Sequence, residues 1–333
     1  MNNIWTLAEQ HEGKLKGVSF ELLHRGRLLA DTLKSKLFSI VIGSGVDDSQ
    51  LNELIERGAD EVIVVKDPAL KGFVCETYVK ILERLVKEHK PHTILAAATT
   101  SGRTLMPYLA IKVNTGLTAD CTDLDIEPGT GNLLQTRPAI GGNIIATIKT
   151  PDHRPNMATV RPKSMRPLEK DKSRKGTIVN LKLNPADIDG RVTITGYHVE
   201  TEGFDHIEEA DVVIAGGKGL KKGDNFSMLR ELADKLDGSV GATRDAVDRG
   251  WISYSQQIGL SGKTISPKLY IGVGISGSVQ HLAGIKTSET IVSINSDPNA
   301  QLHQLADFSI VGDLFEVVPV LTKRLKSMNT ESK

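Results

Sequence analysis

Residues 255–284 read SQQIGLSGKTISPKLYIGVGISGSVQHLAG and carry the most informative motif of the chain. The apolar run Leu269–Val273 is typical of a buried strand, and the GxGxxG motif Gly272–Gly277 begins at its end. The residues from Ser278 onward favour the start of a helix. A strand, a glycine turn and a helix N-terminus together present free backbone N–H groups to a pyrophosphate. The stretch therefore predicts a nucleotide site.

A tight βα turn that binds nothing is the alternative, because a single GxGxxG is a weak signal in a chain with 31 glycines. The position of Asp297 favours the nucleotide site. This residue lies twenty residues after Gly277, where a dinucleotide-binding fold has its ribose-binding carboxylate.

The bulk composition excludes several classes of protein. The 333 residues are enough for two domains with separate cores. A net charge of zero argues against nucleic acid or an anionic membrane as a partner. Two distant cysteines exclude a disulfide framework and indicate a reducing compartment. Neither a signal sequence nor a run of eighteen apolar residues occurs, so we expect a soluble, cytoplasmic protein without a membrane span.

Apolar, β-branched runs alternate with helical patterns in the first part of the chain. This alternation predicts βαβ units, and hence a parallel sheet with helices on both faces. The predicted strands are Ile4–Ala8, Leu37–Ile42, Glu61–Val65 and Thr93–Ala97, and the predicted helices are Val18–Leu33, Leu51–Arg57 and Val74–His89.

The alternation of strand and helix patterns stops between residues 119 and 199, where short apolar runs occur with few helical patterns. We expect antiparallel strands that close the first domain. They are predicted at Asn143–Ile148, Ala158–Val160, Thr177–Leu183 and Val192–Val199.

A polar, acidic segment at 199–209 indicates a linker, after which a second βα series begins. Its predicted strands are Asp211–Ala215, Lys268–Val273, Thr290–Ile294 and Phe308–Val311, and its predicted helices are Asn225–Leu236 and Leu314–Leu325. The sequence thus predicts an α/β protein of two domains. The first is a parallel-sheet α/β/α domain at residues 1–205, the second is a nucleotide-binding α/β domain at 206–326, and a polar tail follows at 327–333.

Several stretches resemble the alpha (large) subunit of electron-transfer flavoproteins. In the second half they are GGKGLKKGDNFSMLRELAD (216–234), VGATRDAVDRGW (240–251), QIGLSGKTISPKLYI (257–271), GISGSVQHLAG (274–284), IVSINSDPNA (291–300) and ADFSIVGDLFEVVP (306–319). Two stretches of the first half, TGLTADCTDLDIE (115–127) and TRPAIGGNIIATI (136–148), look like the versions found in strict anaerobes.

The resemblance implies one FAD in the C-terminal domain and a heterodimer with a smaller beta subunit that docks on the N-terminal domain. It also implies electron delivery to an acyl-CoA dehydrogenase or a related flavoenzyme. The beta subunit of such proteins holds either AMP or a second FAD. In the second case the complex oxidises NADH and splits the electron pair between ferredoxin and the FAD of this chain, which is flavin-based electron bifurcation. The anaerobe-like stretches favour this case, and a simple carrier with AMP is the alternative.

Arg244 resembles the family arginine that lies against the flavin ring, where a fixed cation stabilises negative charge on the reduced flavin. A surface arginine paired with Asp245 or Asp248 is the alternative. Thr243 corresponds to a small hydroxyl residue that contacts the cofactor, and a plain turn residue is its alternative.

The segment Ile258, Gly259, Leu260 and Ser261 resembles the loop at the N5/O4 edge of the flavin. The Ser261 hydroxyl could hydrogen-bond that edge, or it could only cap its own turn. Leu260 stands where many relatives have Gln, so its side chain lacks the hydrogen-bonding groups of that amide.

The unit Ser276, Gly277, Ser278, Val279, Gln280 and His281 resembles the family loop at the pyrophosphate and ribityl chain. Gly277 permits close backbone approach, and Ser276 and Gln280 can donate hydrogen bonds. His281 resembles the histidine near flavin O2, where it could carry or donate a proton. A structural histidine is the alternative.

Four further residues match family contacts. Asn295 resembles a residue that contacts FAD. Asp313 and Leu314 match contacts at the adenosine end, although Asp313 is equally well explained as a helix N-cap. Lys218 stands where many relatives have Arg, and can meet a phosphate as a point charge.

No metal site is expected, and no Ser/His/Asp, Cys/His or paired-carboxylate set suggests bond-making chemistry on a substrate. We therefore expect the chain alone to be an electron carrier, and to be part of an enzyme only within a bifurcating complex. A self-contained NAD-dependent dehydrogenase is the alternative from another class, although its GxGxxG would lie in the first βα turn and not in the last third. A subunit with a vestigial site is a third possibility.

Overall fold

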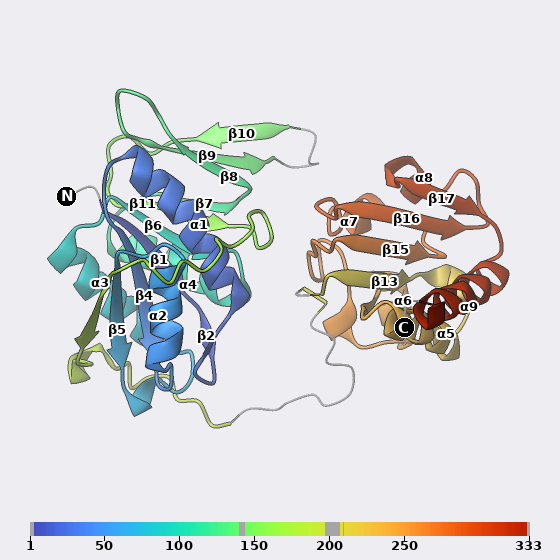
Figure 1. The fold of residues 1–333 in the computed structure, drawn as a ribbon, viewed down its shortest axis with the longest axis horizontal. Helices are drawn as coiled ribbons and strands as arrows, with labels where there is room; N and C mark the ends of the chain where they lie inside the picture. The colour runs from blue at the N-terminus through green and yellow to red at the C-terminus, as the bar shows by residue number, and fades with distance from the viewer. Residues whose placement is uncertain (1–2, 140–143, 197–206, 209, 332–333) are drawn as a thin grey trace. The chain divides into compact units, whose positions relative to one another are not determined.

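The computed structural model describes residues 3–139, 144–196, 207–208 and 210–331. The chain separates into two units, Met1–Tyr197 and His198–Lys333, each with its own sheet and core (Figure 1). The predicted domain boundary between residues 205 and 206 lies outside the described residues. Within the described ranges, no helix is long and apolar enough to cross a membrane.

A seven-stranded sheet forms the centre of the first unit, in the order β12-β5-β4-β1-β6-β11-β7. All neighbouring strands pair in parallel. Every residue of β4 is buried, as expected for a strand that is covered on both faces. The strands are β1 (Ile4–Ala8), β4 (Leu37–Gly43), β5 (Glu61–Lys66), β6 (Thr93–Ala97), β7 (Leu117–Cys121), β11 (Asn156–Val160) and β12 (Thr177–Leu181).

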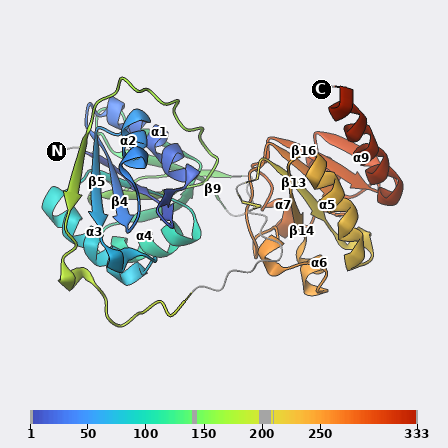
Figure 2. The same ribbon diagram turned by 60° about the horizontal axis from the view of Figure 1, so that its bottom comes forward.

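Helices cover both faces of this sheet, which confirms the predicted α/β/α layers (Figure 2). The helices α1 (Gly17–Thr32) and α2 (Asp48–Glu56) pack on one face, and α3 (Cys75–His89) and α4 (Thr100–Lys112) pack on the other. Helix α4 was not predicted, because its start, TTSG, has the composition of a turn and Pro107 interrupts its pattern. Thr99 begins it by accepting a hydrogen bond from the Gly102 N–H.

The region after residue 119 differs in part from its prediction. The strands β8 (Asp123–Ile126), β9 (Leu133–Pro138) and β10 (Ile145–Ile148) form an antiparallel sheet. Only β10 lies within a predicted strand, and its antiparallel pairing was expected, whereas β8 and β9 were not predicted. By contrast, β11 and β12 are parallel members of the main sheet, and β11 is buried throughout because it lies between β6 and β7. Residues 192–196 are not a strand, and the rest of that prediction lies outside the described residues. A short hairpin of β2 (Gln10–His11) and β3 (Lys14–Leu15) follows β1.

A five-stranded parallel sheet forms the second unit, in the order β14-β13-β15-β16-β17. The strand order reverses between β13 and β15, which is the place where α/β sheets bind ligands. Its strands are β13 (Val212–Gly216), β14 (Ser239–Ala242), β15 (Leu269–Val273), β16 (Thr290–Asn295) and β17 (Phe308–Val311).

Helices again lie on both sides of the sheet (Figure 1). One core contains residues of α5 (Phe226–Lys235), α6 (Arg244–Asp248) and α9 (Leu314–Glu331), and the other contains residues of α7 (Val279–Leu282) and α8 (Gln301–Leu305). Helix α9 continues to Glu331, beyond its predicted end at Leu325. The prediction ended the helix too early because the regularly spaced apolar residues stop before the helical backbone does.

Candidate functional site

The candidate residues gather at one edge of the second sheet. Because all five strands are parallel, their carboxyl ends meet there, and ligands of α/β sheets bind at that edge. The loops that follow the strands carry Lys218 (after β13), Thr243 and Arg244 (after β14), Ser276 to His281 (after β15), Asn295 (at the end of β16), and Asp313 and Leu314 (after β17).

The loop 258–261 reaches the same edge through backbone hydrogen bonds. The Ile258 N–H donates to the carbonyl of Ala242, at 2.9 Å, and the Leu260 N–H donates to the carbonyl of Gln280, also at 2.9 Å. The loop thus lies between the end of β14 and helix α7. All sixteen candidates therefore lie in the strand ends, loops and helix starts along this edge of the sheet.

Glycines make the close backbone packing of this edge possible. A Cβ at Gly217 would lie 2.5 Å from the carbonyl oxygen of Gly274. Gly277 has a φ of +89°, and a Cβ there would lie 2.5 Å from the backbone nitrogen of Leu302 in α8. The fold itself therefore already requires a glycine at position 277.

Free hydrogen-bond donors surround Gly277. The backbone N–H groups of Ser276, Gly277 and Ser278 donate to no other described residue, and the side chains of Ser276, Ser278 and Gln280 are exposed. Lys218, on the neighbouring loop, is also exposed and has no partner among the described residues. These donors and this cation fit the pyrophosphate of a dinucleotide.

Arg244 lies at the first position of α6, and its side chain is 69% exposed. Its Nε lies 3.2 Å from Oδ2 of Asp248, so the ion pair considered as an alternative is present. Exposed pairs of this kind are weak, and the guanidinium can leave Asp248 for another partner. The Thr243 N–H donates to Gly216 O at 3.0 Å, while its hydroxyl bonds no other described residue.

Two side chains form hydrogen bonds with Ser261 in the loop 258–261. Gln257 Nε2 donates to Ser261 Oγ at 3.1 Å, and the Tyr254 hydroxyl donates to the Ser261 carbonyl at 2.8 Å. Leu260, by contrast, is 68% exposed. The loop therefore offers an apolar side chain and one hydroxyl to whatever binds beside it.

His281 is 4% exposed, and both of its ring nitrogens have partners inside the protein. Nε2 lies 2.7 Å from the hydroxyl of Tyr270, and Nδ1 lies 3.1 Å from the carbonyl oxygen of Ile258. Burial lowers the pKa of His281 to about 4, and the hydrogen bond with Ile258 opposes this effect.

Tyr270 was missed by the sequence reasoning. It is fully buried in β15, and burial raises the pKa of its phenol well above the ordinary value. A signal did exist, because a tyrosine in a strand that is otherwise apolar needs a partner for its hydroxyl.

The remaining candidates have roles within the fold. Asn295 is buried, donates to Ile275 O at 2.9 Å and accepts from Asp297 N at 3.1 Å, which fixes the start of the 276–281 loop. Asp313 Oδ1 accepts from the Phe315 N–H at 2.9 Å and so caps α9. Leu314 is 6% exposed, in the core.

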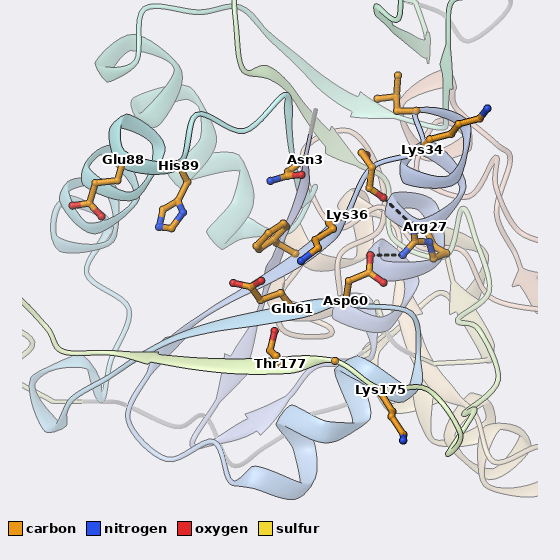
Figure 3. A pocket seen from close by; sticks show the side chains of 14 residues that line it. Asn3, Arg27, Lys34, Lys36, Asp60, Glu61, Glu88, His89, Lys175 and Thr177 are labelled. Atoms are coloured by element: carbon orange, nitrogen blue, oxygen red, sulfur yellow. Dashed lines mark hydrogen bonds and ion pairs between the residues drawn. The ribbon is translucent and has the colours of Figure 1, made fainter. Parts of the chain in front are cut away.

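A hollow of about 1320 Å³ lies in the first unit, far in sequence from these candidates (Figure 3). It is open and lies at the amino ends of parallel strands, where Asn3, Lys36 and Glu61 enter the sheet. Arg27 and Asp60 form an ion pair at its wall, at 2.7 Å. We favour the carboxyl edge of the second unit as the site, because ligands of α/β sheets bind at carboxyl ends, whereas the hollow lies at amino ends and its lining has mixed charge. In the described part of the chain, no group of three or more His, Cys, Asp or Glu residues could hold a metal ion.

Two family descriptions match this chain, the electron transfer flavoprotein domain at residues 4–186 and the electron transfer flavoprotein FAD-binding domain at residues 206–286. An electron transfer flavoprotein subunit alpha of Thermoanaerobacterium thermosaccharolyticum is 47% identical over 98% of both chains. The acryloyl-CoA reductase electron transfer subunit beta of Anaerotignum propionicum is 38% identical over 97% of this chain and 95% of its own. The subunit LctC of a lactate dehydrogenase (NAD(+),ferredoxin) of Acetobacterium woodii is 39% identical over 93% of this chain and 73% of its own.

Proposed function

Because this chain belongs to the electron transfer flavoprotein family as an alpha subunit, we propose that its second unit holds one FAD at the carboxyl edge of the five-stranded sheet. The observation that supports this most is the set of unbonded N–H groups at residues 276–278, beside the exposed Lys218. A pyrophosphate satisfies such donors.

FAD, when bound, accepts and releases electrons one or two at a time. The residues of the chain bind and orient it in three groups. Residues 276–280 and Lys218 hold the pyrophosphate and ribityl chain. Thr243, Arg244 and the loop 258–261 face the ring, where the guanidinium stabilises negative charge. Asn295, Asp313 and Leu314 lie toward the adenosine.

We further propose that the first unit docks the beta subunit and that the heterodimer carries out electron bifurcation. In this proposal the beta subunit holds a second FAD and oxidises NADH. One electron then goes to ferredoxin, and the other goes through the FAD of this chain to an acyl-CoA dehydrogenase or a related flavoenzyme. Two relatives support this choice by their names, a subunit of a lactate dehydrogenase (NAD(+),ferredoxin) and an acryloyl-CoA reductase electron transfer subunit. The anaerobe-like stretches at 115–127 and 136–148 support it as well.

The test is to purify the chain with its beta subunit and count the flavins and AMP in each heterodimer. The complex is then mixed with NADH, ferredoxin and an acyl-CoA dehydrogenase with its enoyl-CoA. We expect two FADs, and ferredoxin reduction that requires the enoyl-CoA. One FAD with one AMP and no NADH oxidation would leave a simple carrier. A chain purified without flavin would refute the FAD site itself.

A further inference from the structure

The Tyr270 hydroxyl, the His281 ring and the Ile258 carbonyl form a continuous hydrogen-bonded line. Its distances are 2.7 Å from the hydroxyl to Nε2 and 3.1 Å from Nδ1 to the carbonyl oxygen. Tyr270 is fully buried, and His281 and Ile258 are 4% and 2% exposed. The line therefore has little access to water.

The chemistry of the two end groups fixes the positions of the protons. A carbonyl oxygen can only accept, so Nδ1 must carry a hydrogen. In a neutral ring Nε2 is then an acceptor, and the Tyr270 hydroxyl donates to it. A second proton on the ring would turn Nε2 into a donor and would leave the phenol hydrogen without an acceptor among the described residues. It would also place a cation where little water reaches it.

The line connects the two segments that are expected to hold the flavin. Ile258 begins the loop at the flavin ring, and His281 ends the 276–281 segment. The same junction contains the hydrogen bond from Leu260 N to Gln280 O, at 2.9 Å. It is tightly packed, because a Cβ at Gly284 would lie 2.7 Å from the Cα of Gly259. Loss of the line would therefore loosen the position of one segment relative to the other.

We propose that Tyr270 is a positioning residue that holds His281 as the neutral tautomer with its proton on Nδ1, and that His281 in turn fixes the loop 258–261 through the Ile258 carbonyl. His281 then serves the cofactor by positioning this loop, and supplies neither a proton nor a positive charge. The part that concerns the flavin rests on the proposed function, whereas the tautomer and the connection to Ile258 do not.

Few other ionisable groups in the described part of the chain can disturb this arrangement. Among the described residues, Tyr270 from β15 is the titratable group hydrogen-bonded to the ring, and burial keeps its phenol protonated by raising its pKa. Helix α7 has no other ionisable residue. On the loop side, Lys263 Nζ lies 3.2 Å from Glu208 Oε2, so these two charges pair with each other.

The first test is nitrogen-15 NMR of the full-length chain with labelled histidine, with and without flavin. The His281 signals are assigned by their loss in His281→Asn. We expect the signature of a neutral ring protonated on Nδ1 from pH 8 to pH 5. In Tyr270→Phe the loss of the donor to Nε2 should raise the proton affinity of the ring roughly tenfold. Tyr78→Phe removes a tyrosine hydroxyl bonded to Ile42 O in the first unit, and should leave the His281 signals unchanged. A doubly protonated ring at pH 7, or a proton on Nε2 alone, would overturn the proposal.

The second test separates positioning from charge by substitution at residue 281. The amide of Asn can donate to Ile258 O as Nδ1 does but can never be a cation, whereas Leu can do neither. We expect His281→Leu to weaken FAD binding about tenfold or more, and Asn to recover most of that loss with a flavin potential of unchanged pH dependence. Equal losses in both variants would contradict the positioning role. Absence of FAD from the unaltered protein would refute the proposed function, and the NMR result would still decide the tautomer.

Discussion

At the residue scale, position 278 is where a negative charge would stabilise the fold but repel a bound phosphate. Ser278 is the N-cap of α7, yet its side chain makes no capping hydrogen bond. Asp is a good N-cap and favours the positive end of a helix. The same carboxylate would repel a pyrophosphate at the free N–H groups of residues 276–278. A substitution at position 278 can therefore separate helix capping from phosphate binding.

We predict that Ser278→Asp keeps or raises the thermal stability of the flavin-free second unit and weakens FAD binding at least about tenfold, which is ~1.4 kcal/mol. Ser278→Asn caps equally well without the charge, and should retain FAD. The measurements are the flavin content of the purified variants and the melting temperature of their flavin-free forms, because bound FAD itself raises the melting temperature. Normal flavin content in the Asp variant would place the pyrophosphate elsewhere. Gly277 is a poorer target, since any side chain there meets the backbone of Leu302.

Arg244, at the start of α6, has a matched control in Arg249, the C-cap residue of the same helix. Arg244 pairs with Asp248 and Arg249 pairs with Asp245, both at i, i+4 spacing and both exposed. We predict that Arg244→Ala lowers the potential of the first one-electron reduction by roughly 40 mV, from a screened interaction of about 1 kcal/mol. Arg249→Ala should leave it unchanged. Spectroelectrochemical titration measures both variants, and equal curves would exclude Arg244 from the flavin ring.

At the scale of the element, the start of α9 shows how a candidate site residue can serve the fold. Asp313 Oδ1 accepts from the Phe315 N–H, and its carbonyl accepts from Glu316 and Val317. We predict that Asp313→Ala destabilises the second unit by about 1 kcal/mol, and that Asp313→Asn destabilises it by less than half as much. Urea unfolding of the flavin-free protein measures this. If both variants also lose FAD equally, the carboxylate contacts the adenosine as well.

The elements that could be predicted from the sequence are those whose apolar residues have a clear period. Strands β1, β6 and β17 match their predicted bounds, because each is a short apolar run between turn residues. The pairing of β11 and β12 could not be predicted in this way. A three-residue apolar run such as that around Ala158 indicates a strand, but which neighbours it joins depends on contacts far away in the sequence.

The sequence predicted which residues belong to the candidate site, but not which of them contact one another. The motif around Gly277 indicated one edge of the sheet, because strand, turn and helix are all local patterns, and the other candidates lie at the same edge. The line from Tyr270 through His281 to Ile258 joins residues up to 23 positions apart. Such contacts depend on the packing of three elements, and a single sequence does not encode them in any local period.

At the scale of the whole molecule, each unit has its own hydrophobic cores, so we expect the two units to unfold separately. The first unit has one core on each face of its sheet, and so has the second. The chain has two tryptophans, and they lie in different units. Trp5 is buried in β1, and Trp251 packs on the core of the second unit. Fluorescence of Trp5→Phe therefore reports the second unit alone, and that of Trp251→Phe reports the first.

The pH dependence of these two signals gives the last prediction. The pKa of His281 is about 4 in the folded protein, against about 6.5 for an unfolded histidine. Between these values the unfolded chain binds the additional proton, so the stability of the second unit must fall as the pH falls from 6.5 to 4. The full loss is on the order of 3 kcal/mol. Urea titrations of flavin-free Trp5→Phe at several pH values should show this loss of stability. Adding His281→Asn should remove the part that His281 contributes. Carboxylates that titrate in the same range contribute equally to both proteins, so the difference between the two isolates His281. The Trp251→Phe signal should not respond to His281→Asn. A change in both signals would mean that the two units unfold together. An unchanged pH dependence of the second unit would mean that His281 binds its proton at the same pH in the folded and in the unfolded chain.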